Sequence, residues 1–377
     1  MGANDVRPRR AGIIGLAVFG AFSIVVALAS AQSPPQMAEQ VFRNVRVLKG
    51  IPVDRFMATM GFFSASLGET CTDCHSAESG GSWAKYADDN PRKETARRMI
   101  GMMNAINRTY FAGRREITCY SCHRGVERPD VTPNLADLYG PPPSKEPDQL
   151  RVPIGKALSA DQILDKYIQA VGGAERLAKL TSFAAKGTYQ GYQDEKYPVE
   201  LFAKAPNQIS TVIHTAAGDS TTTYDGRAGW IAGPATERPV SLLDLTGGGL
   251  TGVKLDAAIW FPGQIGQALT QWRPASTAMI DGREMQMIQG SGDGRYPVNL
   301  YFDAQSGLLA RMVRYDESPV GLNPTQVDYA DYRDVAGVRM PYRVTVTWLD
   351  GKSVTALSEI QPNAPIDAAR FTRPASK

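Results

Sequence analysis

Residues Cys71-Thr72-Asp73-Cys74-His75 and Cys119-Tyr120-Ser121-Cys122-His123 are two copies of the pattern C-x-x-C-H. In this pattern the two thiols can each bond to one vinyl group of a haem, and the adjacent His can ligate the iron. Two copies in one chain exclude a chance match. The sequence therefore predicts two covalently attached haem c groups. The residues predicted to bind them are Cys71, Cys74, His75, Cys119, Cys122 and His123.

Two C-x-x-C pairs can also form a four-cysteine zinc site, two local disulfides or a thioredoxin-like dithiol. Such zinc sites usually have about 15 to 20 residues between the pairs, whereas 44 residues (75–118) separate the pairs here. A zinc site also gives no reason for a His after each pair. All four Cys of the chain lie inside the two motifs, which favours haem.

The number of histidines limits which residues can be axial ligands of the predicted haems. The chain has three His, of which His75 and His123 lie in the motifs and His214 lies in a distant region. At most one haem could therefore have two His ligands. Methionine is the remaining ligand type, and His/Met ligation raises the reduction potential.

Each motif follows a segment whose apolar residues have helical spacing. The first segment begins after Pro52 and ends at Gly68, and the second begins at Asn90-Pro91. Methionines in such segments can be ordinary core residues, but two irons that lack a distal ligand make them candidates. The candidates are Met57 and Met60 in the first segment, and Met99, Met102 and Met103 in the second.

Residues 47–60, 71–75, 96–107 and 118–125 resemble the cytochrome c subunit of photosynthetic reaction centres. The resemblance covers about 100 residues, from about residue 40 to residue 140. It implies that each haem has a helix with an axial Met, then a loop, then the C-x-x-C-H motif. It further implies that the iron ligands are His75 and Met60 for the first haem and His123 and Met99 for the second, with Met57, Met102 and Met103 as packing neighbours.

The chain also departs from that family. Its best-known members carry four haems, one of them with two His ligands, whereas this chain has two motifs. The segment between Ile106 and Thr118, where those members place a distal His, contains no His. The chain thus resembles a two-haem half of such a subunit joined to another domain.

The N-terminal residues predict export. Residues 1–10 carry three Arg and one Asp, and residues 11–31 carry no charge. This pattern is typical of a Sec-type signal peptide, here 1–31, with cleavage after Ala31. Because the apolar run is about 20 residues long, the alternative is a retained inner-membrane anchor formed by residues 11–31. Both alternatives place the body of the protein in the periplasm.

The composition predicts a folded body with two domains. The chain has 377 residues, 43% of them hydrophobic and 21% charged, and a net charge of +3 that is too small to imply nucleic acid. Residues 92–128 carry nine Arg and Lys against three Glu. That excess is either a solvated helix face or a set of partners for haem propionates. The propionate candidates are Arg114, Arg115 and Arg124.

The domain organisation changes after the motifs. We expect a mainly α dihaem cytochrome c domain at residues 32–129, a Pro-rich linker at 130–156 and an antiparallel β domain with packed helices at 157–377. Ser159 and Gln162 make a capping box for a helix. Beyond Leu180 the apolar residues alternate, and four Asp-Gly pairs mark hairpins: Asp225-Gly226, Asp281-Gly282, Asp293-Gly294 and Asp350-Gly351.

The predicted β domain resembles the half-barrel of outer-membrane lipoprotein carriers, in which a curved antiparallel sheet wraps around one or two helices. Residues 253–270, apolar and Gly-containing, are the expected helix on the open side of the sheet. No catalytic set of residues is recognisable in this domain. We expect His214 to be a strand or surface residue.

These observations predict a periplasmic dihaem c-type cytochrome that relays single electrons between membrane-bound or periplasmic redox proteins. On this interpretation the protein is an electron carrier and not an enzyme. A dihaem peroxidase is one alternative, although it needs an iron with a displaceable distal ligand. A sensor or binding module is the other, with a lipid or quinone bound by the β domain.

Overall fold

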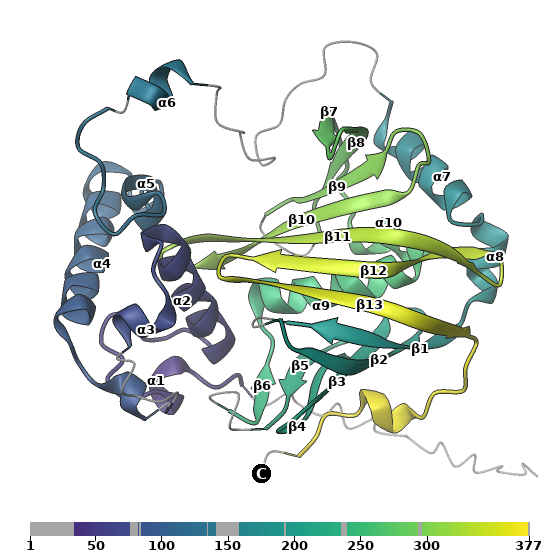
Figure 1. Cartoon of the computed structure of the whole chain (residues 1–377), viewed down its shortest axis with the longest axis horizontal. Helices are drawn as coiled ribbons and strands as arrows, with labels where there is room; N and C mark the ends of the chain where they lie inside the picture. Colours follow the sequence, from purple (N-terminus) through teal and green to yellow (C-terminus); the bar gives the residue numbers. More distant parts are fainter. Residues whose placement is uncertain are drawn as a thin grey trace, which may run out of the picture. The chain divides into compact units, whose positions relative to one another are not determined.

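The computed structural model in Figure 1 describes residues 34–75, 82, 84–133, 135–140, 158–191, 194–234, 240–292 and 296–375. The predicted signal peptide or anchor and most of the predicted linker lie outside the described residues. Residues Pro35–Lys377 form one compact unit. None of the helices in the described ranges is both long and apolar enough to cross a membrane.

The first part of this unit is helical. After α1 (Ala38–Val41), α2 spans Val53–Leu67 and is followed by α3 (Cys71–Cys74) and the short 3-10 helix η2 (Lys85–Ala87). Gly68 ends α2 in the left-handed conformation, with φ of 68°, and its N–H donates to the Ser64 carbonyl. Glycine adopts this conformation without the steric cost of a Cβ. The predicted first helix and its end are confirmed.

The long helix α4 (Pro91–Tyr110) begins as the sequence predicts, because the Asn90 side chain accepts a hydrogen bond from the Lys93 N–H and Pro91 occupies the first helical position. The next element, α5 (Cys119–His123), carries the second motif. The short helix α6 spans Leu135–Tyr139.

Two helices precede the sheet. Helix α7 (Ala160–Ala170) begins at Ser159, whose hydroxyl accepts from the Gln162 N–H while the Gln162 side chain accepts from the Ser159 N–H. This reciprocal pair is the predicted capping box. Helix α8 (Ala174–Lys179) follows directly; the sequence did not predict it as a separate helix.

One antiparallel sheet of 13 strands forms the second part, in the order β6-β5-β4-β3-β2-β1-β13-β12-β11-β10-β9-β8-β7 within the described chain. The strands are β1 (Ser182–Gln190), β2 (Lys196–Lys204), β3 (Gln208–Thr215), β4 (Gly218–Tyr224), β5 (Gly229–Ala232), β6 (Leu242–Asp244), β7 (Arg273–Ile280), β8 (Arg283–Gly290), β9 (Val298–Asp303), β10 (Leu309–Ser318), β11 (Gly321–Val335), β12 (Val338–Trp348) and β13 (Gly351–Pro362). A mainly helical segment followed by an antiparallel sheet confirms the predicted fold class.

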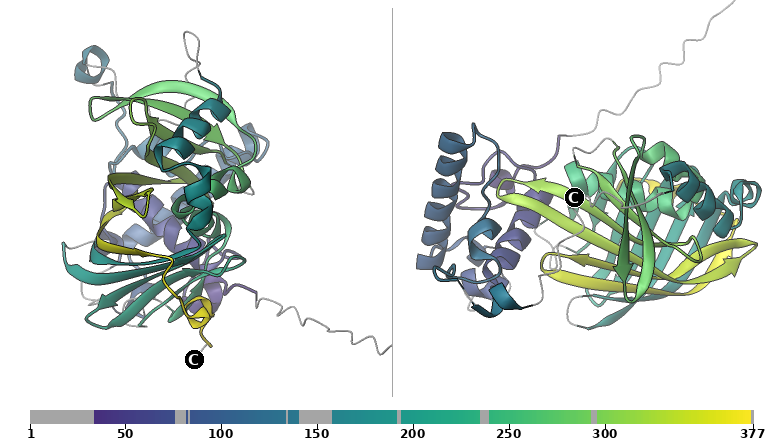
Figure 2. Two further views of the ribbon diagram at one scale, coloured as in Figure 1. Left: turned by 90° about the vertical axis from the view of Figure 1, so that its right-hand side faces the viewer. Right: turned by 90° about the horizontal axis from the view of Figure 1, so that it is seen from above.

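The order of the strands explains why the sheet is curved. Strands β6 and β7 follow each other in the chain but form the two edges of the sheet. A flat sheet of 13 strands would place these edges about 58 Å apart at about 4.8 Å per strand. The main element of the connection, α9 (Gly247–Trp260), has 14 residues and is about 21 Å long. The sheet therefore curves around the connection (Figure 2).

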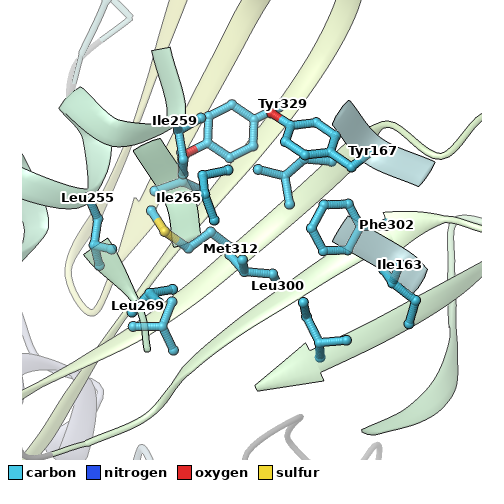
Figure 3. Packing of buried hydrophobic residues seen from close by; sticks show 14 of the residues in the cluster. Ile163, Tyr167, Leu255, Ile259, Ile265, Leu269, Leu300, Phe302, Met312 and Tyr329 are labelled. Carbon is cyan, nitrogen blue, oxygen red and sulfur yellow. The ribbon is translucent and has the colours of Figure 1, made fainter. Parts of the chain in front are cut away.

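Side chains of α9 join the two halves of the sheet. Leu255 and Ile259 pack in one buried cluster with α7, with α10 (Ile265–Ala268) and with strands β8 to β11 (Figure 3). Ala257 and Trp260 pack in a second cluster with strands of the other half. These two clusters form the core between the sheet and its helices. A helix on the open side was predicted from residues 253–270, and the structure confirms it with α9, the turn η3 (Pro262–Gln264) and α10.

The predicted hairpins are found where the structure describes them. Asp225-Gly226 lies between β4 and β5, and Asp281-Gly282 lies between β7 and β8. Asp350 lies in the turn between β12 and β13, and Gly351 is the first residue of β13. Asp293-Gly294 lies outside the described residues. At Asp281-Gly282 both residues have positive φ, 49° and 74°, as a two-residue hairpin turn of type I′ requires.

Candidate haem sites

The first C-x-x-C-H motif lies on the single helical turn α3. Thr70 and Asp73 cap this turn, because the Asp73 carboxylate accepts from the Thr70 N–H at 2.6 Å and from the Thr70 hydroxyl at 2.7 Å. Residues three apart on a helix lie on the same face. Cys71 and Cys74 therefore present their thiols side by side, Cys71 exposed and Cys74 half-buried.

His75 is oriented by a backbone carbonyl. Its Nδ1 lies 2.9 Å from the carbonyl oxygen of Tyr86, so a neutral ring that donates from Nδ1 keeps the Nε2 lone pair free for a metal. Burial is the main cause that lowers the pKa of His75, and the nearby Lys93 ammonium lowers it further. The environment thus favours the neutral imidazole, which is the form that ligates iron.

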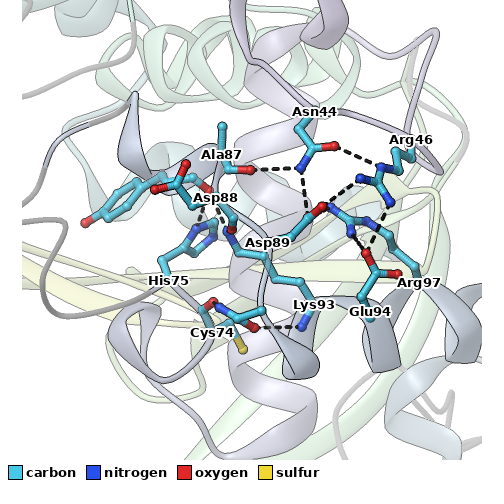
Figure 4. A network of polar contacts seen from close by, with 12 residues as sticks. Asn44, Arg46, Cys74, His75, Ala87, Asp88, Asp89, Lys93, Glu94 and Arg97 are labelled. Atoms are coloured by element: carbon cyan, nitrogen blue, oxygen red, sulfur yellow. Dashed lines mark hydrogen bonds and ion pairs between the residues drawn. The ribbon is translucent and has the colours of Figure 1, made fainter.

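Polar contacts hold the loop that provides this carbonyl (Figure 4). The Lys93 ammonium donates to the carbonyls of Tyr86 and Asp88, both at 2.6 Å. The Asn90 amide donates to the carbonyl of Cys74 at 2.7 Å. The N-terminal end of α4 is therefore bonded both to the motif and to the acceptor of its His.

A second group of contacts in Figure 4 fixes the same end of α4 from the other side. Asp89 bonds to Arg46 at 2.6 Å and to Arg97 at 2.7 Å, and Glu94 pairs with the same two arginines at 3.1 and 2.6 Å. Hydrogen bonding to Arg97 is the largest of the causes that lower the pKa of Asp89. Asn44 completes the network, since its amide donates to Asp89 and to the Ala87 carbonyl.

The second motif has the same local design. Thr118 caps α5 through a capping box with Ser121. His123 Nδ1 lies 3.1 Å from the Val126 carbonyl oxygen, which again leaves Nε2 for a metal. Cys122 is exposed, whereas Cys119 is half-buried against the cluster of Phe62, Ile100 and Met103. Burial raises the pKa of the Cys119 thiol to about 11.

The methionines differ in burial. Met57 and Met60 are both half-buried on α2. Met103 is only 5% exposed and packs with Phe62 and Ile100. Met99 and Met102, by contrast, are 41% and 51% exposed. The burial of Met103 agrees with a packing role, while the exposed side chains of Met99 and Met102 are accessible to a ligand. The choice of Met60 and Met99 as distal ligands stays a prediction.

The residues of both motifs fit a covalently bound haem. Each motif offers two adjacent thiols and one imidazole whose Nε2 is free, which is the donor set of a c-type haem. Cys71, Cys74, Cys119 and Cys122 are all free thiols, so the disulfide alternative is not observed. In the part of the chain that the structure describes, no group of three or more His, Cys, Asp or Glu could hold a metal ion, so the zinc alternative gains no support.

The predicted propionate partners have different environments. Arg114 pairs with Glu116 at 3.1 Å, and Arg115 pairs with Glu317 of β10 at 2.8 Å. The Arg124 side chain has no ion pair with a described residue, and it follows His123 directly. Arg124 is therefore the most available of the three guanidinium groups.

His214 lies in β3, as predicted for a strand residue. Its side chain is 36% exposed, with Nδ1 at 2.7 Å from Asp219 and Nε2 at 3.6 Å from Glu200. Asp219 is within hydrogen-bond distance of Nδ1 and Glu200 lies near Nε2, so both acids explain His214 as a polar residue on the sheet surface.

Several positioning groups could not be found by sequence reasoning. The acceptors of the two His rings are the carbonyls of Tyr86 and Val126, and a backbone carbonyl has no residue signature. Lys93 carried a weak signal, because it lies three residues after Asn90 and so belongs to the first turn of α4.

The comparison with protein families concerns the helical part of the chain. Residues 20–136 match the family model of the photosynthetic reaction centre cytochrome C subunit. This match contains both C-x-x-C-H motifs and both methionine helices, and it confirms the predicted resemblance. It covers less than half of the chain, and the sheet lies outside it.

Curated relatives give the same result. The chain is 36% identical over 131 residues to the photosynthetic reaction center cytochrome c subunit of Thermochromatium tepidum, which covers 34% of this chain and 30% of that protein. It is 33% identical over 105 residues to the subunit of Rubrivivax gelatinosus, which covers 26% of this chain and 27% of that protein. The chain thus spans less than a third of the length of these relatives.

Solved structures are similar to the sheet part. A LolA superfamily protein from Nitrosomonas europaea aligns with 57% of this chain and 98% of its own, at 16% identity and a TM-score of 0.40. A putative outer membrane lipoprotein-sorting protein domain from Vibrio parahaemolyticus aligns with 55% of this chain and 97% of its own, at 10% identity and a TM-score of 0.39.

Proposed function

We propose that this protein is a periplasmic dihaem c-type cytochrome that relays single electrons between membrane-associated or periplasmic redox proteins. The observation that carries the proposal is the repeated local geometry: two thiols on one helical turn, followed by a His whose Nδ1 is bonded to a backbone carbonyl. The match of residues 20–136 to a cytochrome family supports it. Domain boundaries at 32–129 and 157–377 belong to the same proposal.

The chain's own residues have distinct parts in this function. The four cysteines would hold the haems covalently, and a bound haem supplies reversible one-electron chemistry at iron. The carbonyls of Tyr86 and Val126 keep the two imidazoles oriented, so that little needs to reorganise when an electron arrives. Met60 and Met99, as distal ligands, would raise the potentials, because a neutral thioether favours the ferrous state.

The electron-carrier function is favoured over a ligand-binding function of the sheet. The apolar cavity between Leu255, Ile259, Leu269 and Met312 measures about 10 Å³, which is about the room of one water molecule. The buried clusters around it are formed by α7, α9, α10 and the strands. This cavity is too small to hold a lipid or a quinone.

Intact mass tests the proposal. The full chain is produced in cells with and without a cytochrome c maturation system, and the purified protein is weighed under denaturing conditions. We expect two covalent haem increments with the maturation system and none without it. A mass without haem in both preparations would overturn the proposal. The remaining mass also shows whether residues 1–31 are removed.

A further inference from the structure

One face of α2 is held by the sheet and by α9. The Asp54 carboxylate accepts from the Thr246 N–H at 2.6 Å and from the Thr246 hydroxyl at 2.9 Å. The Arg55 guanidinium donates to the Glu317 carbonyl, with Nε at 3.1 Å. The Asn323 amide donates to the Ala58 carbonyl at 3.1 Å. These contacts join residues that are 192 to 265 positions apart in the sequence.

Apolar packing continues the same face. Phe62, four residues after Ala58, is 6% exposed and packs against the fully buried Val320 between β10 and β11. Residues 54, 58 and 62 share one helix face because they are four apart. Met60 lies two residues from Ala58 and is therefore turned about 200° away from it. The sheet thus contacts the side of α2 that lies opposite to Met60, the predicted iron ligand.

Asp54 joins two helix N-termini. It lies in the first turn of α2, where its carboxylate also accepts from the Arg55 N–H at 2.8 Å. Thr246 is the residue that precedes α9, and its own side chain does not cap that helix. A negative charge is stabilised at a helix N-terminus, so one carboxylate serves both helices. Burial nevertheless raises the pKa of Asp54.

Asp316 of β10 completes the junction. Its carboxylate accepts from the Gly248 N–H at 3.0 Å. A Cβ at Gly248 would lie 2.3 Å from the Asp316 side chain, so this close approach requires glycine. The positive charge of Arg55 acts on both acids, since it lowers the pKa of Asp54 and of Asp316 against the opposing effect of burial. The start of α9 is therefore built around two carboxylates, one from the sheet and one from α2.

The second motif is tied to the same strand. Arg115, four residues before Cys119, pairs with the Glu317 carboxylate at 2.8 Å, while the Glu317 carbonyl accepts from Arg55. Both segments that carry predicted haem ligands are thus bonded to one residue of β10.

We propose that Asp54 is a positioning residue for the first haem, and that the sheet serves to fix α2 so that its methionine stays on the iron. The inference deepens the proposed function and rests on it, because it requires a haem at Cys71, Cys74 and His75. It holds whether Met60 or Met57 is the ligand, since both lie on α2.

The test compares Asp54→Ala with the matched control Asp303→Ala in the full-length haem-loaded protein. Asp303 is buried and pairs with Arg283 at 3.3 Å. Like Asp54, its carboxylate accepts from two backbone N–H groups and one hydroxyl, those of Gln305 and Ser306. It lies at the end of β9, and the partners of its side chain among the described residues are Arg283, Gln305 and Ser306. Both variants are expected to lose stability to a similar extent.

The readouts are the red absorption band of methionine-ligated ferric haem and the two reduction potentials. For Asp54→Ala we expect the intensity of this band to fall by the contribution of one haem. We also expect one reduction potential to fall and the second to stay unchanged. For Asp303→Ala we expect no change in either. A folded Asp54→Ala protein with the wild-type band and potentials would overturn the inference, as would equal spectroscopic changes in both variants.

Thr246→Val provides a second variant in case Asp54→Ala does not fold. It removes the hydroxyl donor but keeps the backbone N–H and the side-chain volume, so we expect a smaller change of the same sign. Unchanged spectra and potentials in folded Thr246→Val would overturn the inference. Met57→Ala and Met60→Ala serve as references; if neither loses methionine ligation, α2 does not carry the ligand and the inference is wrong. Two haem increments in the wild-type mass separate these outcomes from a failure of the proposed function.

Discussion

The buried side chain of Asn107 forms two hydrogen bonds with the backbone of Ile117: its amide donates to the Ile117 carbonyl at 2.7 Å, and its carbonyl accepts from the Ile117 N–H at 3.0 Å. The same oxygen accepts from the Glu116 N–H at 3.1 Å. One residue of α4 therefore closes the loop that leads to Cys119. We expect Asn107 to set the position of the second motif relative to α4.

Asn107→Ala should lower the free energy of unfolding by about 1–3 kcal/mol, because it leaves the partly buried backbone groups of Glu116 and Ile117 without these partners. Urea unfolding of the wild type and the variant measures the effect. Asn104→Ala, at an exposed position of the same helix, is the control and should change stability by less than about 0.5 kcal/mol. Equal losses in the two variants would show that the loop does not depend on Asn107.

The two motifs should bind haem independently, because each has its own thiols and its own His acceptor. The double variant Cys71→Ala/Cys74→Ala is expected to carry one haem increment in its intact mass, and Cys119→Ala/Cys122→Ala is expected to do the same. The variant that combines all four changes should carry none. A single pair whose removal abolishes both haems would contradict this independence.

The three methionines of α4 should have different roles, one in packing and one in iron ligation. Met103→Ala is expected to cost about 2–4 kcal/mol of stability, because it opens a cavity beside Phe62 and Ile100, and it should leave the methionine-ligated ferric spectrum unchanged. Met99→Ala should remove methionine ligation from one haem, whereas Met102→Ala should not. Loss of ligation in Met102→Ala alone would assign the second haem to Met102 and make the Met99 prediction wrong.

The local parts of this structure could be predicted from the sequence, and the non-local parts could not. The caps at Asn90 and Ser159 depend on residues three positions away, so α4 and α7 begin where the sequence predicts. The bond between Asp54 and Thr246 joins residues 192 positions apart, and no local pattern indicates it. Arg115 shows the same limit: the charge excess suggested a propionate partner, but the fold pairs it with Glu317, 202 positions away.

The free energy of unfolding should depend on pH in part through Asp316. Burial raises its pKa above the ordinary 3.8, and Asp54 adds to the rise, while the Gly248 N–H and the Arg55 charge oppose it. Above the ordinary pKa of 3.8 the folded state therefore retains the proton longer than the unfolded state. The contribution of Asp316 to stability is present below the unfolded pKa and is lost as the pH rises through the folded pKa.

Asp316→Asn should remove this loss, since the amide oxygen can still accept from Gly248 and carries no charge. Its unfolding free energy should rise relative to the wild type as the pH increases from about 4. Asp89→Asn is the control of opposite sign, because hydrogen bonding to Arg97 lowers the pKa of Asp89. Asp89 stabilises the fold above the unfolded pKa, and that stability is lost as the pH falls through its folded pKa. Parallel curves for Asp316→Asn and the wild type would contradict the assignment.

Arg124 offers a final test of the charge around the second motif. It follows His123 in the left-handed conformation, with φ of 51°, and its side chain has no ion pair with a described residue. A guanidinium close to an iron, or bonded to a propionate, disfavours the ferric state and raises the potential. Arg124→Gln should therefore lower one of the two potentials in a redox titration.

Arg114→Gln is the matched control, because the Arg114 charge is already compensated by Glu116 at 3.1 Å and its side chain is 72% exposed. We expect both potentials of this variant to stay at the wild-type values. A comparison at low and high salt separates a bonded propionate from a distant charge, since only the exposed charge is screened. Equal potentials in Arg124→Gln and the wild type would show that Arg124 belongs to the solvated face of the protein and not to the haem.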